Sequence, residues 1–202
     1  MENLVDFKKL FNGVYDGKRV LITGNTGFKG SWLSHWLIEM GAKVKGVSLK
    51  PNTTPNHFEE LDLPYATDFI DINNLEELKT SITSFSPEII FHLAAQPLVR
   101  ESYSKPIYTL NTNIIGTAHI LEIGRSCPDL KAILIVTTDK CYENKEQTYA
   151  YKESDPMGGF DPYSASKACS ELITKSYQRA FFSKENYRKK HQTLIATARA
   201  GN

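Results

Sequence analysis

Short runs of β-branched residues alternate with segments of helical periodicity along most of the chain. The six runs rich in Val and Ile are 18–23, 43–47, 67–70, 88–93, 131–137 and 193–198. Helical patterns cover 28–40, 75–85, 106–126 and 162–182. Short strands that alternate with helices are joined by crossovers, so they lie parallel in one sheet. The pattern therefore predicts an α/β fold, a doubly wound parallel Rossmann sheet with helices on both faces.

Turn-forming residues mark the ends of the predicted helices. Gly41 follows the first helix, where a C-terminal cap is expected, and Asn73 or Asn74 caps the second. Pro106 begins the third, in the first turn that proline tolerates. The segment 143–161 is polar, rich in Gly and without periodicity, so we expect a long loop of functional importance.

Charge and composition argue against several classes of function. Lys and Arg number 24 against 23 Asp and Glu, and this balance disfavours nucleic-acid binding by bulk charge. No apolar run approaches the ~20 residues of a membrane helix, and the first residues lack the apolar core of a signal peptide. Cys127, Cys141 and Cys169 show no CxxC spacing. We therefore expect a soluble cytoplasmic protein without a disulfide framework or a metal site.

A glycine-rich loop follows the first predicted strand and opens the first helix, with the pattern G-x-x-G-x-x-G from Gly24 to Gly30. Glycine lets the backbone turn tightly and approach a diphosphate, and the helix N-terminus supplies free N–H groups and partial positive charge. The alternative is a glycine turn that binds nothing. The candidate dinucleotide contacts in the loop are Gly24, Thr26, Gly27, Phe28, Lys29 and Gly30.

The residue that would recognise the adenosine ribose is less clear. Dinucleotide folds usually place an acid about 20 residues beyond the loop, but the segment from Met40 to Phe58 contains none. Ser48 and Lys50 occupy this region; Lys50 could meet the 2′-phosphate of NADP or be solvated. Asp71 could line the adenine edge or serve only in a turn. The further candidate cofactor contacts are Ser48, Asp71, Ile72, Leu93, Ala94 and Ala95.

Tyr163 and Lys167 lie four residues apart at the start of the last predicted helix, and therefore on one face. A free phenol has a pKa near ~10 and is a poor base at neutral pH. A neighbouring ammonium and a cationic nicotinamide ring would favour the phenolate. This pair after a glycine loop predicts abstraction of a hydroxyl proton during hydride transfer.

The fifth predicted strand closes with Thr137, Thr138, Asp139 and Lys140. Ligands of open α/β sheets bind beyond the carboxyl ends of the strands. A hydroxyl there could hydrogen-bond a substrate alcohol, a carboxyl could act as an acid, and a lysine as an acid or an electrostatic aid. The alternative is a polar turn at a strand end.

These motifs resemble the extended short-chain dehydrogenases/reductases, the NAD-dependent epimerase/dehydratase family, and within it the branch that dehydrates CDP-glucose. The resemblance spans nearly all of the chain. It is carried by GNTGFKGSWLSHWL from Gly24, FHLAAQPLVRESY from Phe91, NTNIIGTAHILE from Asn111, TTDKCYEN from Thr137, DPYSASKACSEL from Asp161 and ARAGN from Ala198.

The resemblance implies a role for each matching residue. Tyr163 would be the base, Lys167 its partner and Thr138 the hydroxyl of the triad. Asp139 matches the acid of related dehydratases, but Lys140 stands where they carry Glu, as in the CDP-glucose branch. This departure leaves the group that removes the proton from the fifth sugar carbon unassigned. The candidate substrate contacts are Gln96, Arg100, Asn113, Thr138 and Asn202. Arg100 could also form a surface ion pair.

The implied reaction is a dehydration by internal hydride transfer through NAD, which yields CDP-4-keto-6-deoxyglucose. The implied substrate is CDP-glucose or a related sugar nucleotide, with NAD preferred over NADP. Two other functions stay open. One is an epimerase or a dehydratase of another sugar nucleotide, which Lys140 argues against. The other is a non-catalytic dinucleotide sensor, which the retained Tyr163 and Lys167 argue against.

We expect residues 1–17 to be an N-terminal extension and 18–202 an NAD-binding Rossmann domain, with the C-terminal substrate-binding lobe missing. Without a lobe to exclude water and position the sugar, we expect NAD binding with little turnover. The resemblance also implies a homodimer or higher homo-oligomer, built through the helices that begin at Pro106 and Pro162.

Four further side chains have simple structural interpretations. We expect His92 to be a hydrogen-bonded core histidine and Cys141 to be a small buried residue. We expect Trp32 and Trp36, four residues apart, to belong to the core.

Overall fold

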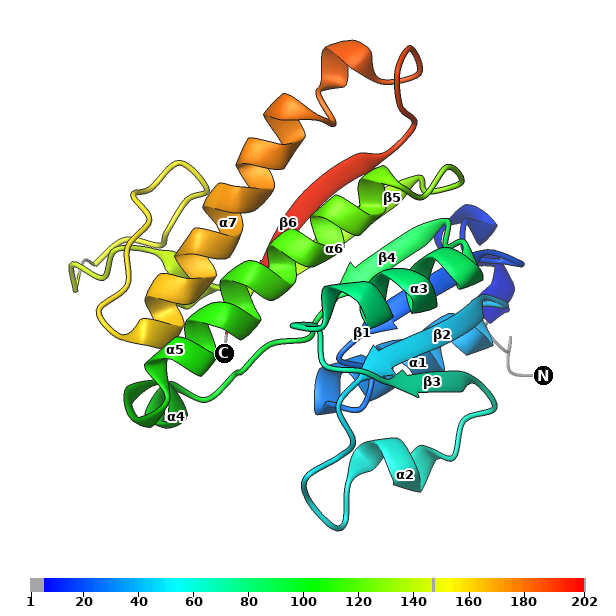
Figure 1. Cartoon of the computed structure of the whole chain (residues 1–202), viewed down its shortest axis with the longest axis horizontal. Coiled ribbons are helices and arrows are strands. Elements are labelled where there is room, and N and C mark those ends of the chain that lie inside the picture. The colour runs from blue at the N-terminus through cyan, green and yellow to red at the C-terminus, as the bar shows by residue number, and fades with distance from the viewer. Residues whose placement is uncertain (1–5, 147, 202) are drawn as a thin grey trace.

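The computed structural model describes residues 6–146 and 148–201, and it contains one sheet of six parallel strands in the order β3-β2-β1-β4-β5-β6 (Figure 1). This confirms the predicted doubly wound fold. The strands are β1 Arg19–Thr23, β2 Lys43–Ser48, β3 Ala66–Phe69, β4 Ile89–His92, β5 Ala132–Thr138 and β6 Leu194–Ala200. The order reverses between β1 and β4. Ligands of such sheets bind in the crevice outside the strand ends at this reversal.

Helices cover both faces of the sheet, with α3, α6 and α7 in front and α1 behind in Figure 1. The larger helices are α1 Phe28–Glu39, α3 Leu75–Phe85, α6 Gly116–Arg125 and α7 Pro162–Ala180. The shorter ones are η1 Phe7–Gly13, α2 His57–Leu61, α4 Val99–Ser104, α5 Pro106–Leu110, η2 Asn111–Ile115, η3 Asp139–Cys141 and η4 Lys184–Asn186. None of the helices in the described part of the chain is long and apolar enough to cross a membrane.

Each face of the sheet has its own apolar core. On one face, Leu78 and Ile82 of α3 and Ile120 of α6 pack against strand residues such as Ile90. On the other face, Leu37 of α1 packs against β1. The central strands are buried on both faces, because Val20, Leu21 and Ile22 of β1 are all inaccessible to solvent. This explains why the predicted strands contain continuous Val and Ile rather than alternating residues.

The predicted helix 106–126 is interrupted in the structure. A π-helical segment, η2, separates α5 from α6, and the chain continues through it in a helical conformation. Single π-helical turns inside α-helices are frequent at functional sites. The segment carries Asn113, one of the predicted site residues.

The prediction that Trp32 and Trp36 belong to the core is wrong. Their side chains are 49% and 51% exposed. The buried residues of α1 are Gly30, Ser31, Ser34 and Leu37. These mostly small residues let the helix lie close to the sheet, which leaves both indoles on the outer face. Trp32 instead stacks on His57 of α2, with ring centroids 4.6 Å apart.

Candidate active site

The loop between β1 and α1 closes tightly onto the end of β4. Gly24 has φ +75°, and a Cβ atom there would lie 2.7 Å from the backbone nitrogen of Ala94. A Cβ atom on Gly30 would lie 2.1 Å from the carbonyl oxygen of Gly24. Glycine is therefore required at both positions, one for backbone conformation and close approach, the other for helix-to-loop packing.

The N-terminus of α1 has free donors at this loop. Gly27 is the N-cap residue and supplies no side-chain cap. The first intrahelical bond runs from the amide of Ser31 to the carbonyl of Gly27, at 2.9 Å. The amides of Phe28, Lys29 and Gly30 therefore lack partners within the helix, and a helix end of this kind binds phosphate. The loop geometry fits a diphosphate.

Asn25 anchors the glycine loop to β3 and the residue before it, a role that was not predicted from the sequence. Its side chain is fully buried and donates from Nδ2 to Tyr65 Oη (3.0 Å) and Thr67 Oγ1 (2.9 Å). Gly46 of β2 makes room for it, since a Cβ atom there would lie 2.2 Å from Asn25 Nδ2. The only sequence signal was a polar residue between two glycines.

The side chains at the end of β2 are neutral where an acid is usual. Ser48 Oγ lies 2.7 Å from Thr26 Oγ1, which itself donates to the carbonyl of Leu49 (2.9 Å). Ser48 is therefore the donor to Thr26. The Lys50 ammonium lies 5.7 Å from the centre of the Phe69 ring on β3. Both residues lie at the edge where the ribose of a dinucleotide would be recognised.

The residues predicted to line the adenine edge, Asp71 and Ile72, have hydrogen bonds and packing contacts with other residues of the chain. Asp71 Oδ1 accepts hydrogen bonds from the backbone and side-chain nitrogens of Asn73, both at 2.9 Å. Ile72 packs in the core against Gly116, and its carbonyl accepts a bond from His119. Asp71 thus lies in a turn, and its place at the adenine edge stays a prediction. Leu93, Ala94 and Ala95 follow β4, beside the glycine loop.

The N-terminus of α7 presents Tyr163 and Lys167 one turn apart. Asp161 caps the helix by accepting bonds from Ser164 N (2.9 Å) and Ser164 Oγ (2.6 Å), and Pro162 occupies the first turn. Lys167 is only 8% exposed, and its ammonium donates to the carbonyl of Val136 on β5 at 3.2 Å. The cap and this bond fix the pair against the end of β5.

Burial governs the proton affinities of this pair. It raises the pKa of Tyr163, as Asp139 and Asp161 also do, against a lowering by the neighbouring hydroxyl of Thr138. Burial and the nearby charge of Lys29 lower the pKa of Lys167 to about 8, against a raising by Glu171. The net shift of the Tyr163 pKa is upward, because the burial of the phenol outweighs the effect of the Thr138 hydroxyl.

The segment after β5 forms a tight polar turn. Thr138 Oγ1 donates to Asp139 Oδ1 (3.0 Å) and accepts from the amide of Lys140 (3.3 Å). Asp139 and Lys140 are exposed, whereas Cys141 is fully buried as expected, which raises the pKa of its thiol to about 11. Thr138 thus lies beside the phenol, with the two charged side chains next to it at the surface.

Asn113 joins the end of β4 to α7 from the π-helical segment. Its Oδ1 accepts from the amide of Gln96 (2.8 Å), and its Nδ2 donates to the Gln96 carbonyl (3.1 Å) and to Ser166 Oγ (2.8 Å). The Gln96 side chain is buried and bonded to Thr109 and Leu98. Asn113 and Gln96 therefore hold the site together from within.

Of the remaining predicted side chains, one is internal, one is exposed and one lies outside the described residues. His92 is buried as expected, with its ring nitrogens 2.7 Å from Thr23 Oγ1 and 3.2 Å from Thr117 Oγ1. Burial and, secondarily, the charge of Lys167 lower its pKa to about 3, so the ring is neutral. Arg100 is exposed on α4 and forms no ion pair with the described residues. Asn202 lies outside the described residues.

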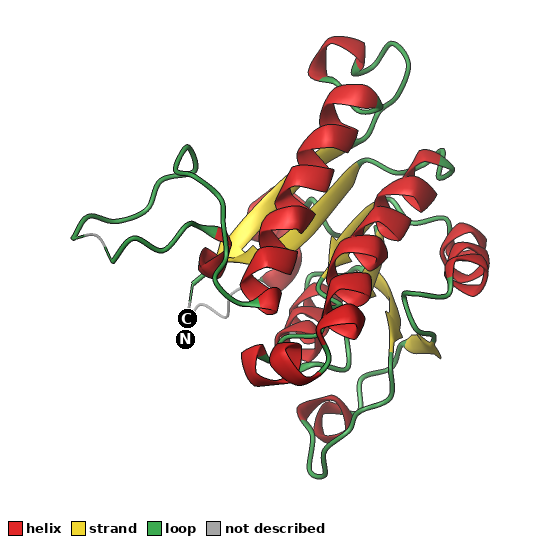
Figure 2. Cartoon of the chain, turned by 60° about the vertical axis from the view of Figure 1, so that its left-hand side comes forward, coloured by secondary structure: helices red, strands yellow, loops and turns green. Residues whose placement is uncertain are grey.

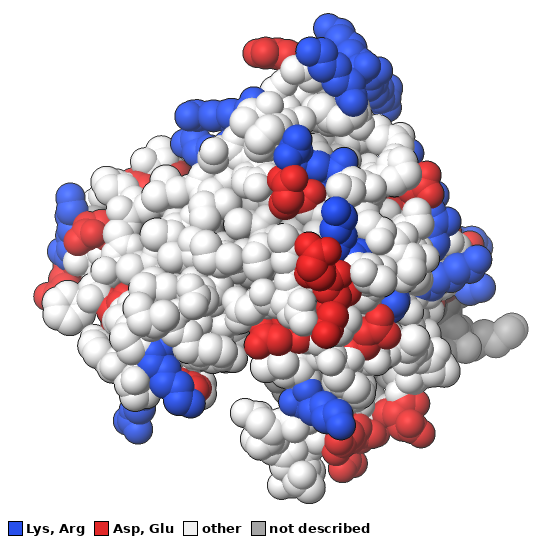
Figure 3. All heavy atoms as spheres, in the orientation of Figure 1, with Lys and Arg blue, Asp and Glu red and all other residues white. Residues whose placement is uncertain are grey.

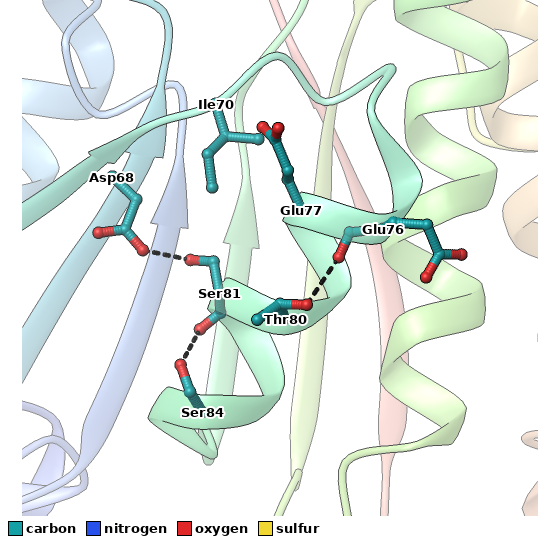
Figure 4. A pocket seen from close by; sticks show the side chains of 7 residues that line it. All are labelled: Asp68, Ile70, Glu76, Glu77, Thr80, Ser81 and Ser84. Carbon is teal, nitrogen blue, oxygen red and sulfur yellow. Dashed lines mark hydrogen bonds between the residues drawn. The ribbon is translucent and has the colours of Figure 1, made fainter.

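A second hollow, of about 490 Å³, lies between β3 and α3, which carry none of the predicted site residues (Figure 4). Its lining includes Asp68, Glu76 and Glu77. Asp68 is already paired, with Lys45 at 2.8 Å and Ser81 at 2.6 Å. These contacts lower the pKa of Asp68, and its negative charge is paired with Lys45. The acidic hollow is lined by residues 68–84, so it is separate from the glycine loop and α7.

The fold is that of a Rossmann protein, with a glycine-rich loop after β1 and a Tyr–Lys pair at the start of α7. The chain belongs to the GDP-mannose 4,6 dehydratase family, whose model matches residues 21–184. A curated relative from Salmonella typhimurium, CDP-glucose 4,6-dehydratase, is 50% identical over 190 residues, which cover 93% of this chain and 53% of the relative. The chain thus spans about half the length of that relative.

Solved structures show the same fold. UDP-glucose 4-epimerase of Thermotoga maritima, solved with UDP-glucose, superposes with a TM-score of 0.75 and 25% identity, over 90% of this chain and 54% of that one. UDP-glucose 4-epimerase of Thermus thermophilus, solved with NAD, gives a TM-score of 0.73 and 23% identity, over the same shares of the two chains.

Proposed function

We propose that this chain is the cofactor-binding part of a sugar-nucleotide 4,6-dehydratase that converts CDP-glucose to CDP-4-keto-6-deoxyglucose. The observation that carries the proposal is the 50% identity to a CDP-glucose 4,6-dehydratase. The chain carries a glycine loop after β1, a Thr-Asp-Lys turn after β5 and a Tyr–Lys pair at the start of α7. The TDKCYEN segment supports the CDP-glucose branch through Lys140, where related dehydratases carry Glu.

The proposed cofactor is NAD, held by the residues of the glycine loop. The close approach of Gly24 to Ala94 and the free amides at the start of α1 support a diphosphate there. Ser48 and Thr26 would recognise the ribose without a charged group. The position of Lys50 over Phe69 supports NAD over NADP, because this lysine is drawn toward β3. NAD, when bound, supplies a hydride acceptor and later returns the hydride to the sugar.

The proton transfers fall to this chain's own side chains. Tyr163 would accept the proton of the sugar 4-hydroxyl, and Thr138 would hydrogen-bond the same hydroxyl. Lys167, whose pKa is lowered to about 8 by burial, can exchange a proton near neutral pH. Asp139 and Lys140, which are exposed beside Thr138, would assist the loss of water. Gln96, Asn113, Arg100 and Asn202 stay predictions as substrate contacts.

The division of the chain also remains a proposal, with 1–17 as an N-terminal extension and 18–202 as the NAD-binding domain. The matched relative is about twice as long as the part that aligns. We expect the 202 residues by themselves to bind NAD and to turn over CDP-glucose poorly, because few of these residues would enclose the sugar. The cytoplasmic location expected from the sequence belongs to the same proposal.

A homodimer is part of the proposal, through the faces of α5, α6 and α7. Exposed apolar side chains lie on α5, on η2 and on α7, among them Ile107, Tyr108, Ile115 and Leu172. In Figure 3 the area over α5 and the neighbouring part of α7 is almost free of charged side chains, while acidic side chains gather over α3. An apolar area of this kind is typical of a protein–protein interface.

Product analysis tests the proposal. CDP-glucose is incubated with the chain and NAD, and the product is identified by mass spectrometry and by proton NMR of the sugar, with Tyr163→Phe as the inactive control. A slow loss of one water per CDP-glucose, absent in the variant, is the expected result. An epimerised hexose of unchanged mass would show the alternative epimerase activity. NAD binding with no conversion, even in a longer version of the chain, would favour a dinucleotide sensor.

A further inference from the structure

A buried ion pair joins the helix of the catalytic pair to the last strand. Glu171 Oε2 lies 3.0 Å from Arg199 Nη2, and the side chains are 4% and 14% exposed. Glu171 lies one helical turn beyond Lys167 and two beyond Tyr163, so the three residues share one face of α7. Glu171 also accepts hydrogen bonds from Thr137 (2.5 Å) and Thr197 (3.0 Å). One carboxylate thus connects α7, β5 and β6.

Arg199 uses its other donor nitrogen on the segment that follows η3. Its Nη1 donates to Tyr142 Oη (2.8 Å) and to the carbonyl of Glu153 (3.3 Å). The guanidinium carbon also lies 4.8 Å from the centre of the Tyr142 ring. Tyr142 stacks in turn on Tyr151, with centroids 4.6 Å apart and planes 4° from parallel. A single guanidinium therefore contacts α7, the residue after η3, and the long loop.

The loop 142–161, described at every residue but 147, begins beside Asp139 and Lys140 and ends at the cap of α7 (Figure 2). It returns along its own start: the amide of Glu143 donates to the carbonyl of Pro156 (2.9 Å), and that of Gly158 to the carbonyl of Cys141 (3.0 Å). The loop thus joins the two groups of site residues, the Asp139–Lys140 turn and the Tyr163 helix end.

The pair is poorly explained by stability alone. A buried ion pair costs desolvation that its attraction rarely exceeds, and apolar residues of the same volume often serve as well. Although burial alone would raise the pKa of Glu171, the bonds from Arg199, Thr137 and Thr197 hold it below its usual value. The carboxylate is therefore charged, and the planar guanidinium meets several partners in fixed directions, which lysine cannot do.

We propose that Arg199, oriented by Glu171, is a positioning residue that clamps the loop 142–161 and thereby fixes Asp139 and Lys140 relative to Tyr163 and Lys167. The roles of those four residues rest on the proposed function. The clamp itself requires neither cofactor nor substrate, so it is tested on the free protein.

The test measures loop opening in the cofactor-free chain by chymotrypsin cleavage after Tyr149 and Tyr151, well below the Tm. Hydrogen exchange of the peptide 138–142 is measured in parallel, because the amides of Lys140 and Tyr142 are bonded within this turn. Arg199→Lys keeps the charge beside Glu171 but cannot also reach Tyr142 and Glu153. We expect loop cleavage and exchange to rise about tenfold, with Tm close to wild type.

Arg125→Lys is the matched control. Arg125 has the same chemistry, an ion pair with Glu122 at 2.8 Å and a position 4.0 Å from the centre of the Phe181 ring, but it lies away from the loop. We expect it to leave cleavage and exchange unchanged. Tyr142→Phe removes the hydroxyl that accepts the bond from Arg199 and leaves the Arg199–Glu171 ion pair intact. We expect loop cleavage and exchange to rise several-fold at an unchanged Tm.

Wild-type cleavage and exchange rates in both Arg199→Lys and Tyr142→Phe would overturn the proposal. So would an acceleration shared by Arg125→Lys or accounted for by a lower Tm, because the pair would then be merely structural. Faster loop cleavage and exchange in Arg199→Lys at an unchanged Tm is thus the discriminating result. Failure of NAD binding or of turnover would count against the proposed function alone, since neither enters these measurements.

Discussion

Lys167 shows how the proposed chemistry conflicts with stability at a single residue. Its amine is almost completely buried, and this lowers its pKa from 10.5 to about 8. Between these values the unfolded state binds more protons than the folded state, so the stability contributed at this position rises with pH. Below pH 8 both states are protonated, and the cost of burying the charge is complete. The fold thus keeps an unfavourable lysine beside Tyr163.

We predict that Lys167→Met raises the free energy of unfolding at pH 7 by roughly 2 kcal/mol, the relieved burial cost less the lost bond to Val136. The gain should shrink as the pH rises from 8 to 10.5, where the wild-type amine loses its proton on folding. Urea unfolding across this range measures it, with Lys175→Met, an exposed lysine on the same helix, as control. A gain independent of pH, or a loss at pH 7, would contradict the burial argument.

Gly30 gives a second prediction at this scale. A Cβ atom there would lie 2.1 Å from the Gly24 carbonyl, so Gly30→Ala must shift the phosphate loop. We expect NAD affinity to fall at least about tenfold, because displaced amides lose their bonds to the diphosphate. Calorimetric titration measures this. Gly17→Ala is the control, since it has positive φ but no atom within 4 Å of the added Cβ; it should cost some stability and leave NAD affinity unchanged. Equal affinities for all three proteins would remove the loop from the cofactor site.

Among the elements, α7 concentrates the proposed chemistry at its first turn. Asp161 caps the helix through Ser164, and its charge also raises the pKa of Tyr163. We predict that Asp161→Ala lowers the free energy of unfolding by about 1 kcal/mol, the usual worth of an N-cap. Asp161→Asn should retain most of the cap and lower the pKa of the phenol. Thermal unfolding and ultraviolet titration, each against the matching Tyr163→Phe protein, check the two effects. An unstable asparagine variant would show that charge rather than capping dominates.

Long, strongly patterned elements could be predicted from the sequence. The helix Leu75–Phe85 has the predicted bounds and the Asn74 cap, and the strands shift by one or two residues. The π-helical turn in Asn111–Ile115 could not be foreseen, because no local propensity distinguishes it from the flanking α-helix. The short helices His57–Leu61 and Val99–Ser104 were missed, because one or two turns leave too little periodicity to detect. On α1, the small residues Ser31 and Ser34 lie on the buried face, whereas the large apolar residues Trp32 and Trp36 are exposed, so residue size and hydrophobicity gave the wrong face.

The parts of the candidate site that consist of short local sequence patterns could be predicted. The glycine loop and the Tyr163–Lys167 spacing are local patterns, and the parallel sheet brings them to one edge. The supporting contacts join residues far apart in the chain and have no local signal. Asn113 with Gln96 and Ser166, Asn25 with Gly46, and Arg199 with Glu171 all depend on the finished packing.

At the scale of the whole molecule, the uncharged area over α5 and α7 (Figure 3) underlies the proposed dimer. We predict that Leu172→Glu, which places a charge on an exposed apolar side chain of α7, converts a dimer to a monomer. Burying an unpaired carboxylate in an interface costs several kcal/mol, enough for more than a hundredfold weaker association. Light scattering after gel filtration measures the mass. Lys184→Glu, on η4, is the control and should remain dimeric. A wild-type monomer, or a dimeric Leu172→Glu protein, would contradict this interface.

The central claim is that one crevice holds a dinucleotide against the Tyr–Lys pair. A crystal structure of the chain with NAD measures this directly. We predict that the diphosphate binds to the amides of Phe28, Lys29 and Gly30 and that the nicotinamide ring lies beside the Tyr163 hydroxyl. A nicotinamide ring bound away from Tyr163, or a diphosphate bound elsewhere than this loop, would contradict it.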